Sequence, residues 1–465
     1  MNERPGRKEQ ELVRGLGAGD AALVTIGSVL GTGIFITTGD IARNLPHAGL
    51  ILLAWIGGGL FTLAGALTYA ELGALYPRAG GQYHFLRETY GLFWGFLFGW
   101  AAFLVIMSGG IATLAVGFGE YLGAFLPFFS TGHVLFQVPL GHWTWVVSGG
   151  QLAACLAILL LSAINYLGVK EGAAVQNVIT VVKIGSIVGL IGFGLAVSAP
   201  VAPRLTAPLP RGGVITAFGV AMIAVAWSYD GWYAVTNLGG EMRRPQRDLP
   251  LGLIGGTLVL TLLYTAVNLV YIRALPVEAM GLTGRIGEAA ASVLFGPSGA
   301  RLITAAVLLS TFGCISSTIL YAARIYLPMA QDGVFFPSLA RIHPRYLTPS
   351  TCIVAQGAWA SLLTFSGTYE QLYTYVVFAV VLFHAATGAA VIVLRKTRPD
   401  VPRPYRTWGY PVVPLLFVLC SLALAANTLL EKPVESLIGL GILGLGLPAY
   451  LWWRRQGKER PHRAA

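Results

Sequence analysis

The sequence has little charge. Only 11% of its 465 residues are Asp, Glu, Lys or Arg, and 55% are hydrophobic, whereas a soluble domain typically carries about 25% charged residues. This shortage excludes a soluble globular protein. From Ala18 to Trp453, apolar stretches follow one another, each near the roughly 20 residues that a helix needs to cross a bilayer core. No room remains for a sizeable soluble domain.

Cysteine is also scarce. The four cysteines, Cys155, Cys314, Cys352 and Cys420, fall inside apolar stretches, so no disulfide framework is expected. The chain also lacks His-Glu-x-x-His, Cys-x-x-Cys and Gly-x-x-x-x-Gly-Lys motifs, which bind zinc or cradle phosphates. These absences argue against a membrane-embedded enzyme and against an ATP-driven pump. We expect no metal and no cofactor.

The basic residues follow a membrane pattern. The net charge is +11, but the basic residues lie in short clusters between apolar stretches and at the two ends, so nucleic acid is not an expected partner. Most of these clusters fall on one side if the N-terminus is cytoplasmic, and the positive-inside rule then places both termini in the cytoplasm. The polar segment before Ala18 has no apolar core followed by a cleavage site, so we expect no signal peptide.

The apolar stretches predict an all-α membrane protein of about twelve transmembrane helices. They lie near residues 19–43, 48–76, 91–125, 143–166, 172–197, 212–241, 249–274, 299–329, 350–366, 370–395, 410–430 and 434–453. A Pro-rich segment separates five helices from the next five. The expected organisation is a cytoplasmic tail (1–17), a first five-helix repeat (18–198), an outside loop (199–211), a second five-helix repeat (212–396), a cytoplasmic loop with helices 11 and 12 (397–453) and a cytoplasmic tail (454–465).

Glycines interrupt two spans in corresponding positions. The first span contains Gly27 and Gly31-Thr32-Gly33, and the sixth contains Gly219 and Ser228-Tyr229-Asp230-Gly231. Such a pair is typical of transporters built from inverted repeats, and a broken helix is tolerated in lipid only where it lines a cavity or meets a ligand. We therefore predict breaks in helices 1 and 6 at mid-membrane, around a substrate site. Glycines that only ease helix packing are the alternative. Two unlike breaks that form one site favour alternating access over a channel.

Five groups of motifs carry a family resemblance. They are Gly27-Ser28-Val29-Leu30-Gly31-Thr32-Gly33-Ile34-Phe35, the stretch from Glu71 to Gly81, Asp230-Gly231-Trp232 with Gly240-Glu241-Met242, Ala323-Arg324 with Gln331-Asp332-Gly333, and Arg403-Pro404-Tyr405-Arg406 with Gly409-Tyr410-Pro411. Together they resemble the amino acid-polyamine-organocation superfamily, in particular its L-type amino acid transporter branch and bacterial relatives. The resemblance implies a LeuT-like fold, with a 5+5 inverted repeat and two further helices, that transports amino acids.

The resemblance also assigns the site. It places the substrate carboxylate at the amides of Thr32, Gly33 and Ile34, because a helix N-terminus favours an anion, and Gly31 and Gly33 let the backbones approach. It places the substrate ammonium at carbonyls near Val225, Ala226 and Trp227, with the Trp227 ring as the outer gate. The other residues expected around the substrate are Tyr264, Asn268 and Ser316.

Asp230 leaves the substrate class open. An ionisable residue inside a membrane is a functional candidate, and Asp230 could attract a cationic side chain, titrate, or cap the broken helix. The main interpretation is a sodium-independent secondary transporter of small or neutral L-amino acids, acting by exchange or with protons. The alternative is a cationic amino acid or polyamine carrier that uses Asp230.

Lys183 is the basic residue in the middle of a span. Inserting a charge there costs roughly 2.5 to 3.5 kcal/mol, so we expect this side chain to face the bundle interior and to have partners. The resemblance implies that its ammonium replaces the sodium ion of sodium-coupled relatives, with Gly27, Ser317 and Thr318 around it. Because burial disfavours the charged form of an amine, proton coupling is a second role, and pinning two helices is the structural alternative.

The loop between helices 3 and 4 bears on partners. Family members that need a heavy chain join it through a cysteine in this loop, but here the segment from Pro127 to His142 has none. We therefore expect no disulfide-linked heavy chain, and a bacterial inner-membrane protein whose partners are its amino acid substrate and the bilayer. The sequence leaves the oligomeric state open.

Overall fold

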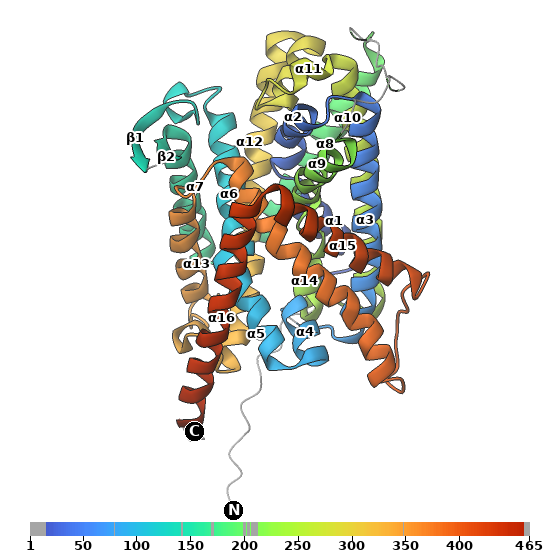
Figure 1. The fold of residues 1–465 in the computed structure, drawn as a ribbon, viewed down its shortest axis with the longest axis vertical. Helices are drawn as coiled ribbons and strands as arrows, with labels where there is room; N and C mark the ends of the chain where they lie inside the picture. Colours follow the sequence, from blue (N-terminus) through green and yellow to red (C-terminus); the bar gives the residue numbers. More distant parts are fainter. Residues whose placement is uncertain are drawn as a thin grey trace, which may run out of the picture.

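The computed structural model describes residues 15–78, 80–140, 143–168, 172–198, 201, 205, 213–346 and 348–459. Its helices pack into one elongated bundle, and the described chain begins and ends at the same, lower end (Figure 1). In the described part, ten helices are long and apolar enough to cross a membrane, a bent pair forms one more span, and a shorter apolar helix lies at Ser350–Leu363. The predicted all-α membrane fold with about twelve spans is confirmed.

Helices make up most of the described chain. Their bounds are α1 Ala18–Val29, α2 Gly33–Asn44, α3 Ala48–Leu75, α4 Gln82–Tyr90, α5 Leu92–Ala101, a π-helical turn η1 Ala102–Ile106, α6 Met107–Leu122, a 3-10 turn η2 Pro127–Phe129, α7 Gly149–Tyr166, α8 Gly172–Ala196, α9 Val214–Tyr229, 3-10 turns η3 Trp232–Asn237 and η4 Gly239–Glu241, α10 Pro245–Ala274, α11 Val277–Met280, α12 Ile286–Gln331, a 3-10 turn η5 Pro337–Ala340, α13 Ser350–Leu363, α14 Tyr369–Thr397, α15 Val412–Glu431 and α16 Pro433–Glu459.

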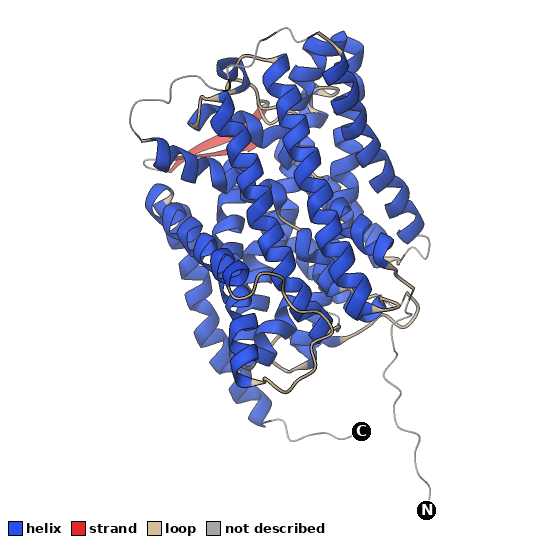
Figure 2. Cartoon of the chain, turned by 90° about the vertical axis from the view of Figure 1, so that its right-hand side faces the viewer, coloured by secondary structure: helices blue, strands red, loops and turns tan. Residues whose placement is uncertain are grey.

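The fourth predicted helix begins too early. Residues 143–148 form strand β2 (Trp143–Ser148), which pairs antiparallel with β1 (Val134–Leu140). These are the strands of the described part (Figure 2). Alternating aromatic and β-branched residues favour a strand here. Ser148 then starts α7 as its N-cap, because its hydroxyl accepts the Gln151 amide and so satisfies a free N–H of the first turn.

The eighth predicted helix is incomplete. Element α12 begins at Ile286 and contains a kink at Gly296, where φ is 71°, so two helices meet there. The segment before the kink is missing from the prediction, as is α4 between the second and third spans. Both are too short or too polar to give the sustained apolar run on which the prediction of spans depends.

The broken first span lies inside the bundle. Helix α1 packs along α10, which also packs along α3, and α2 packs along α9, while α12 packs against α6 and α8. Small residues allow these close contacts. For example, a Cβ added at Gly252 of α10 would overlap the Ala21 side chain of α1. This packing brings the two predicted breaks to the centre of the molecule.

Candidate functional site

The first span breaks after Val29. Helix α1 ends there, α2 starts at Gly33, and the two helices are bent by 46°. The last carbonyls of a helix lack partners within it, and in lipid they must be satisfied by other groups. Four side chains do this here. Each donates to one backbone carbonyl oxygen: Lys183 Nζ to Gly27 at 3.2 Å, Cys314 Sγ to Ser28 at 3.2 Å, Tyr264 Oη to Val29 at 3.1 Å and Ser310 Oγ to Leu30 at 2.9 Å.

The sixth span breaks after Tyr229. Asp230 is extended, with φ −62° and ψ 151°, and Gly231 has φ 97°, after which the chain continues as the 3-10 turn η3. A positive φ of this kind favours glycine. A Cβ at Gly231 would also lie 2.9 Å from the Ser28 carbonyl oxygen. The two breaks therefore face each other, and glycine is required at their contact.

Helix α2 and the end of α9 touch directly. A Cβ at Gly33 would lie 2.8 Å from the Ser228 Cα and 2.9 Å from its Oγ. Next to this contact, the hydroxyls of Thr37 and Ser228 are 2.6 Å apart. The N-terminus of one half-helix is thereby fixed against the C-terminal turn of the other, so the positive end of one dipole lies beside the negative end of the other.

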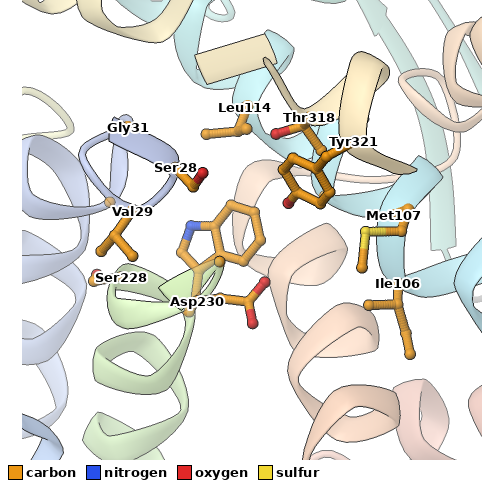
Figure 3. A pocket seen from close by; sticks show the side chains of 14 residues that line it. Ser28, Val29, Gly31, Ile106, Met107, Leu114, Ser228, Asp230, Thr318 and Tyr321 are labelled. Carbon is orange, nitrogen blue, oxygen red and sulfur yellow. The ribbon is translucent and has the colours of Figure 1, made fainter. Parts of the chain in front are cut away.

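A cavity lies at this junction. Its empty space, including the part open to solvent, is about 430 Å³. Its walls come from α1, the break, α2, α6, α9, the second break and α12. The lining residues are Ser28, Val29, Gly31, Gly33, Ile106, Met107, Gly110, Leu114, Trp227, Ser228, Asp230, Gly231, Thr318 and Tyr321. The Asp230 carboxylate, the Tyr321 hydroxyl and the Met107 side chain point into the space between these walls (Figure 3).

Five of the residues expected at the site line this cavity: Gly31, Gly33, Trp227, Asp230 and Thr318. Three others expected around the substrate lie outside the lining, and their polar groups are engaged elsewhere. Tyr264 caps α1 as described, the Asn268 amide bonds Thr38 and the Tyr264 carbonyl, and the Ser316 hydroxyl is 3.1 Å from Asn165 Nδ2. These side chains support the break and its neighbours.

The backbone amides expected to bind the substrate carboxylate lie at the start of α2, whereas two of the residues expected to bind the ammonium lie outside the cavity lining. Thr32 is the N-cap of α2, and Gly33 and Ile34 begin that helix, so their amides belong to the first turn, which lacks intrahelical acceptors. Val225 and Ala226 lie within α9, and neither lines the cavity. The carbonyl of Trp227 already accepts the Asp230 amide at 3.0 Å.

One wall was missed by the sequence analysis. Ile106, Met107, Gly110 and Leu114 line the cavity from α6 and the end of η1. The π-helical turn directly precedes α6, and such turns are frequent at functional sites. No motif marks this wall in the sequence. Tyr321, also missed, follows Thr318 by three residues, a spacing that places both side chains on one face of a helix.

Trp227 closes one side of the cavity. Its side chain is 6% exposed, and its indole Nε1 donates to the Tyr369 hydroxyl at 2.9 Å. That hydroxyl is also 3.1 Å from Thr32 Oγ1. The indole lies nearly parallel to the Tyr373 ring, with an interplanar angle of 15°. A second cavity lies beyond this layer, and Tyr373 lines it together with Asp40, Glu370 and Lys432.

We expect Trp227→Ala to lower transport strongly while the protein still folds. The change removes a hydrogen bond and ring contacts worth together about 1 to 3 kcal/mol, which corresponds to a loss of about 5- to 150-fold. Uptake into proteoliposomes measures the effect, and thermal unfolding checks the fold. Trp452→Ala is the matched control, because Trp452 is 52% exposed on α16. Equal uptake by the two variants would remove the gate assignment.

Lys183 lies next to the first break, in α8. Its side chain is 2% exposed, and its Nζ reaches the Gly27 carbonyl oxygen. The expected hydroxyl neighbours donate elsewhere. Ser317 Oγ bonds the Gly313 and Cys314 carbonyls, and Thr318 Oγ1 bonds the Cys314 carbonyl. The ammonium is therefore placed at the negative end of the α1 dipole.

Asp230 lies at the second break and on the cavity wall. The ion pairs among the described residues all use other carboxylates. The cavity therefore combines a carboxylate, two half-helix ends and an apolar wall from α6. This combination suits a small ligand that carries both charges.

Comparison with known proteins gives consistent matches. A family model described as "Amino acid permease" matches residues 16–440. The serine/threonine exchanger SteT of Bacillus subtilis (strain 168) is 31% identical over 441 residues, covering 94% of this chain and 96% of that protein. The b(0,+)-type amino acid transporter 1 of Homo sapiens is 30% identical over 433 residues, covering 92% and 85%. The large neutral amino acids transporter small subunit 2 of Mus musculus is 28% identical over 455 residues, covering 96% and 83%.

Proposed function

Because this chain belongs to the amino acid permease family, we propose that it exchanges small neutral L-amino acids across the membrane by alternating access, without sodium. It is a multi-pass membrane protein of a family of transporters, not of enzymes. The observation that carries the proposal is the pair of broken helices that face each other across one cavity. A relative that is named a serine/threonine exchanger supports both the substrate class and the exchange mode.

Each end of the substrate has a proposed partner. The carboxylate binds the amides of Thr32, Gly33 and Ile34, where a helix N-terminus contributes about 0.3 to 1 kcal/mol and up to about 2 kcal/mol in buried geometries. The ammonium binds carbonyls of the last turn of α9 near Trp227. Trp227 with Tyr369 and Tyr373 closes one side. These contacts use the carboxylate and the ammonium of the substrate. The substrate side chain then faces the apolar wall from α6.

The arrangement in the cell is also proposed. Residues 18–198 and 212–396 form the two inverted repeats, and helices 11 and 12 follow. The protein lies in an inner membrane. Both termini lie on the cytoplasmic side, since the basic segments gather on the side of the N-terminus. No cysteine lies between Pro127 and His142, so the chain works without a disulfide-linked partner.

Counterflow tests the proposal. Purified protein is reconstituted in proteoliposomes loaded with unlabelled serine, and uptake of labelled serine is followed with sodium replaced by choline. We expect internal serine to accelerate uptake and the sodium replacement to leave it unchanged. A thermal-shift screen of the twenty amino acids and common polyamines gives an independent ranking, since a ligand at 100 times its Kd stabilises by about 2.7 kcal/mol. Uptake that internal substrate does not accelerate would argue against exchange.

The cavity carboxylate favours a second candidate, a carrier of cationic amino acids or polyamines. We predict that Asp230→Asn lowers transport of cationic substrates by about 10-fold or more. The substitution leaves the positive side chain of the bound substrate without its carboxylate partner, and removing one member of a buried charge pair costs several kcal/mol of binding. Serine uptake should change little. Competition by lysine, putrescine and serine measures the difference. Asp400→Asn, at an exposed loop position, is the control. Equal loss for all substrates would indicate that Asp230 caps the broken helix.

A further inference from the structure

The β1–β2 hairpin and the segment just before it carry exposed apolar side chains. The hairpin lies at the end of the bundle opposite the end of α16, beside the tops of α6 and α7 (Figure 1). The hairpin patch consists of exposed side chains in and just before β1: Phe125, Leu126, Phe128, Val134, Leu135, Phe136 and Val138, with exposed fractions of 38 to 50%. From residue 121 to residue 169 the chain contains no Asp, Glu, Lys or Arg. Such a patch marks an interaction surface.

The two faces of the hairpin differ. Phe136 pairs with Val147, and Val138 pairs with Trp145, so these four side chains share one face. The Phe136 and Trp145 rings are 5.6 Å apart. The opposite face pairs Gln137 with Val146 and Pro139 with Thr144, and Gln137 and Thr144 are both exposed. The first face is wholly apolar and the second carries the polar side chains, and this asymmetry fits a boundary between an apolar phase and water.

The hairpin is fixed at the level of the membrane boundary. Strand β2 ends at Ser148 and α7 begins at Gly149 with no linker. Helix α7 has 18 residues, a length of about 27 Å, which nearly equals the roughly 30 Å of a hydrocarbon core. Its start must therefore lie at the boundary. Trp145 Nε1 also donates to the Phe365 carbonyl at 2.7 Å, just beyond the end of α13.

The apolar surface continues onto the membrane-spanning part. On α7, Leu156, Leu159 and Leu160 are 49 to 54% exposed, as expected for a lipid-facing helix. The hairpin patch lies at the end of this same surface. A two-stranded ribbon leaves edge N–H and C=O groups unpaired, and these groups need water, so the ribbon belongs at the headgroup level and not in the core.

We propose that the β1–β2 hairpin lies flat on the lipid surface of the leaflet opposite the two ends of the described chain, with Phe136 and Val138 facing the acyl chains and Gln137 facing water. Aromatic side chains favour this level of a bilayer. The contact holds the joined ends of α6, α7 and α13 at a fixed depth. It is independent of the transported substrate.

Spin labels test the orientation in the full-length chain. Phe136→Cys and Gln137→Cys are each labelled in a background whose four native cysteines are serine, in vesicles of phosphatidylcholine and phosphatidylglycerol. We expect the label at 136 to be relaxed more by oxygen than by a water-soluble nickel chelate, at a depth of about 5 to 10 Å. The label at 137, one residue along the strand, should show the opposite preference.

Two results would overturn the proposal. If the labels at 136 and 137 both report water, the hairpin lies in solvent. If both are shielded, and each is broadened by the same label on another molecule, a second copy of the chain covers the patch. If the cysteine-free background does not fold, Phe136→Asp and Gln137→Asp in the native sequence replace the labels. We then expect only Phe136→Asp to lower the Tm in vesicles, and equal shifts for the two variants would contradict the proposal.

Discussion

Gly33→Ala is expected to lower amino acid transport by about 10- to 100-fold, because misplacement by about 1 Å in a positioned site costs up to about 100-fold. The new Cβ would lie 2.8 Å from the Cα of Ser228. Backbone atoms of two packed half-helices cannot rotate away, so α2 must shift from the end of α9. The shift moves the amides that are proposed to hold the substrate carboxylate.

Two other glycines provide controls for this effect. At Gly57 in α3 an added Cβ meets nothing within 4 Å, so Gly57→Ala should transport like the wild type. At Gly31 the obstacle at 2.7 Å is the end of the Leu114 side chain, which can rotate, so Gly31→Ala should be affected less than Gly33→Ala. Uptake in proteoliposomes, normalised to folded protein by size-exclusion chromatography, gives the order. A Gly33 variant as active as the Gly57 variant would show that the close approach is not needed.

Lys183→Ala is expected to fold but to transport at least about 5-fold less than the wild type. It leaves the Gly27 carbonyl without its donor, and an unsatisfied buried acceptor costs about 1 to 3 kcal/mol, which is about 5- to 150-fold in an equilibrium. The ammonium also offsets the negative end of the α1 half-helix. Of the four side-chain donors at this end, it is the one with a formal charge.

Three comparisons complete this test. Lys183→Met keeps most of the side-chain volume and removes the charge, so it should fail like Lys183→Ala. Lys396→Ala, at an exposed position near the end of α14, should behave as the wild type. Uptake by the unmodified protein should be the same in sodium and in choline. Strict dependence on sodium would contradict the idea that the lysine replaces an ion.

Much of the architecture follows from sequence pattern. Apolar runs of sufficient length gave the spans, since the bilayer imposes one length on every crossing helix. The glycines at 31, 33 and 231 gave the breaks, because a break in lipid needs residues that tolerate close backbone contact or positive φ. The errors fall where this pattern is weak. Strand β2 is apolar and runs directly into α7, so its residues were assigned to the start of that helix. The segment before Gly296 is too short to be recognised as a span.

The sequence by itself determined that this is a multi-span membrane protein of the amino acid permease family, broken at two matched places, because hydropathy, glycine position and motifs are local. Beyond Gly31, Gly33, Trp227, Asp230 and Thr318, which the sequence had indicated, the residues that surround the cavity were decided only by the tertiary structure. The wall from Ile106 to Leu114, the donors that cap α1, and the positions of Asn268 and Ser316 outside the cavity lining all depend on how α6, α8, α10 and α12 are rotated about their axes. That rotation is set by side-chain packing between helices far apart in the chain, which no local pattern contains.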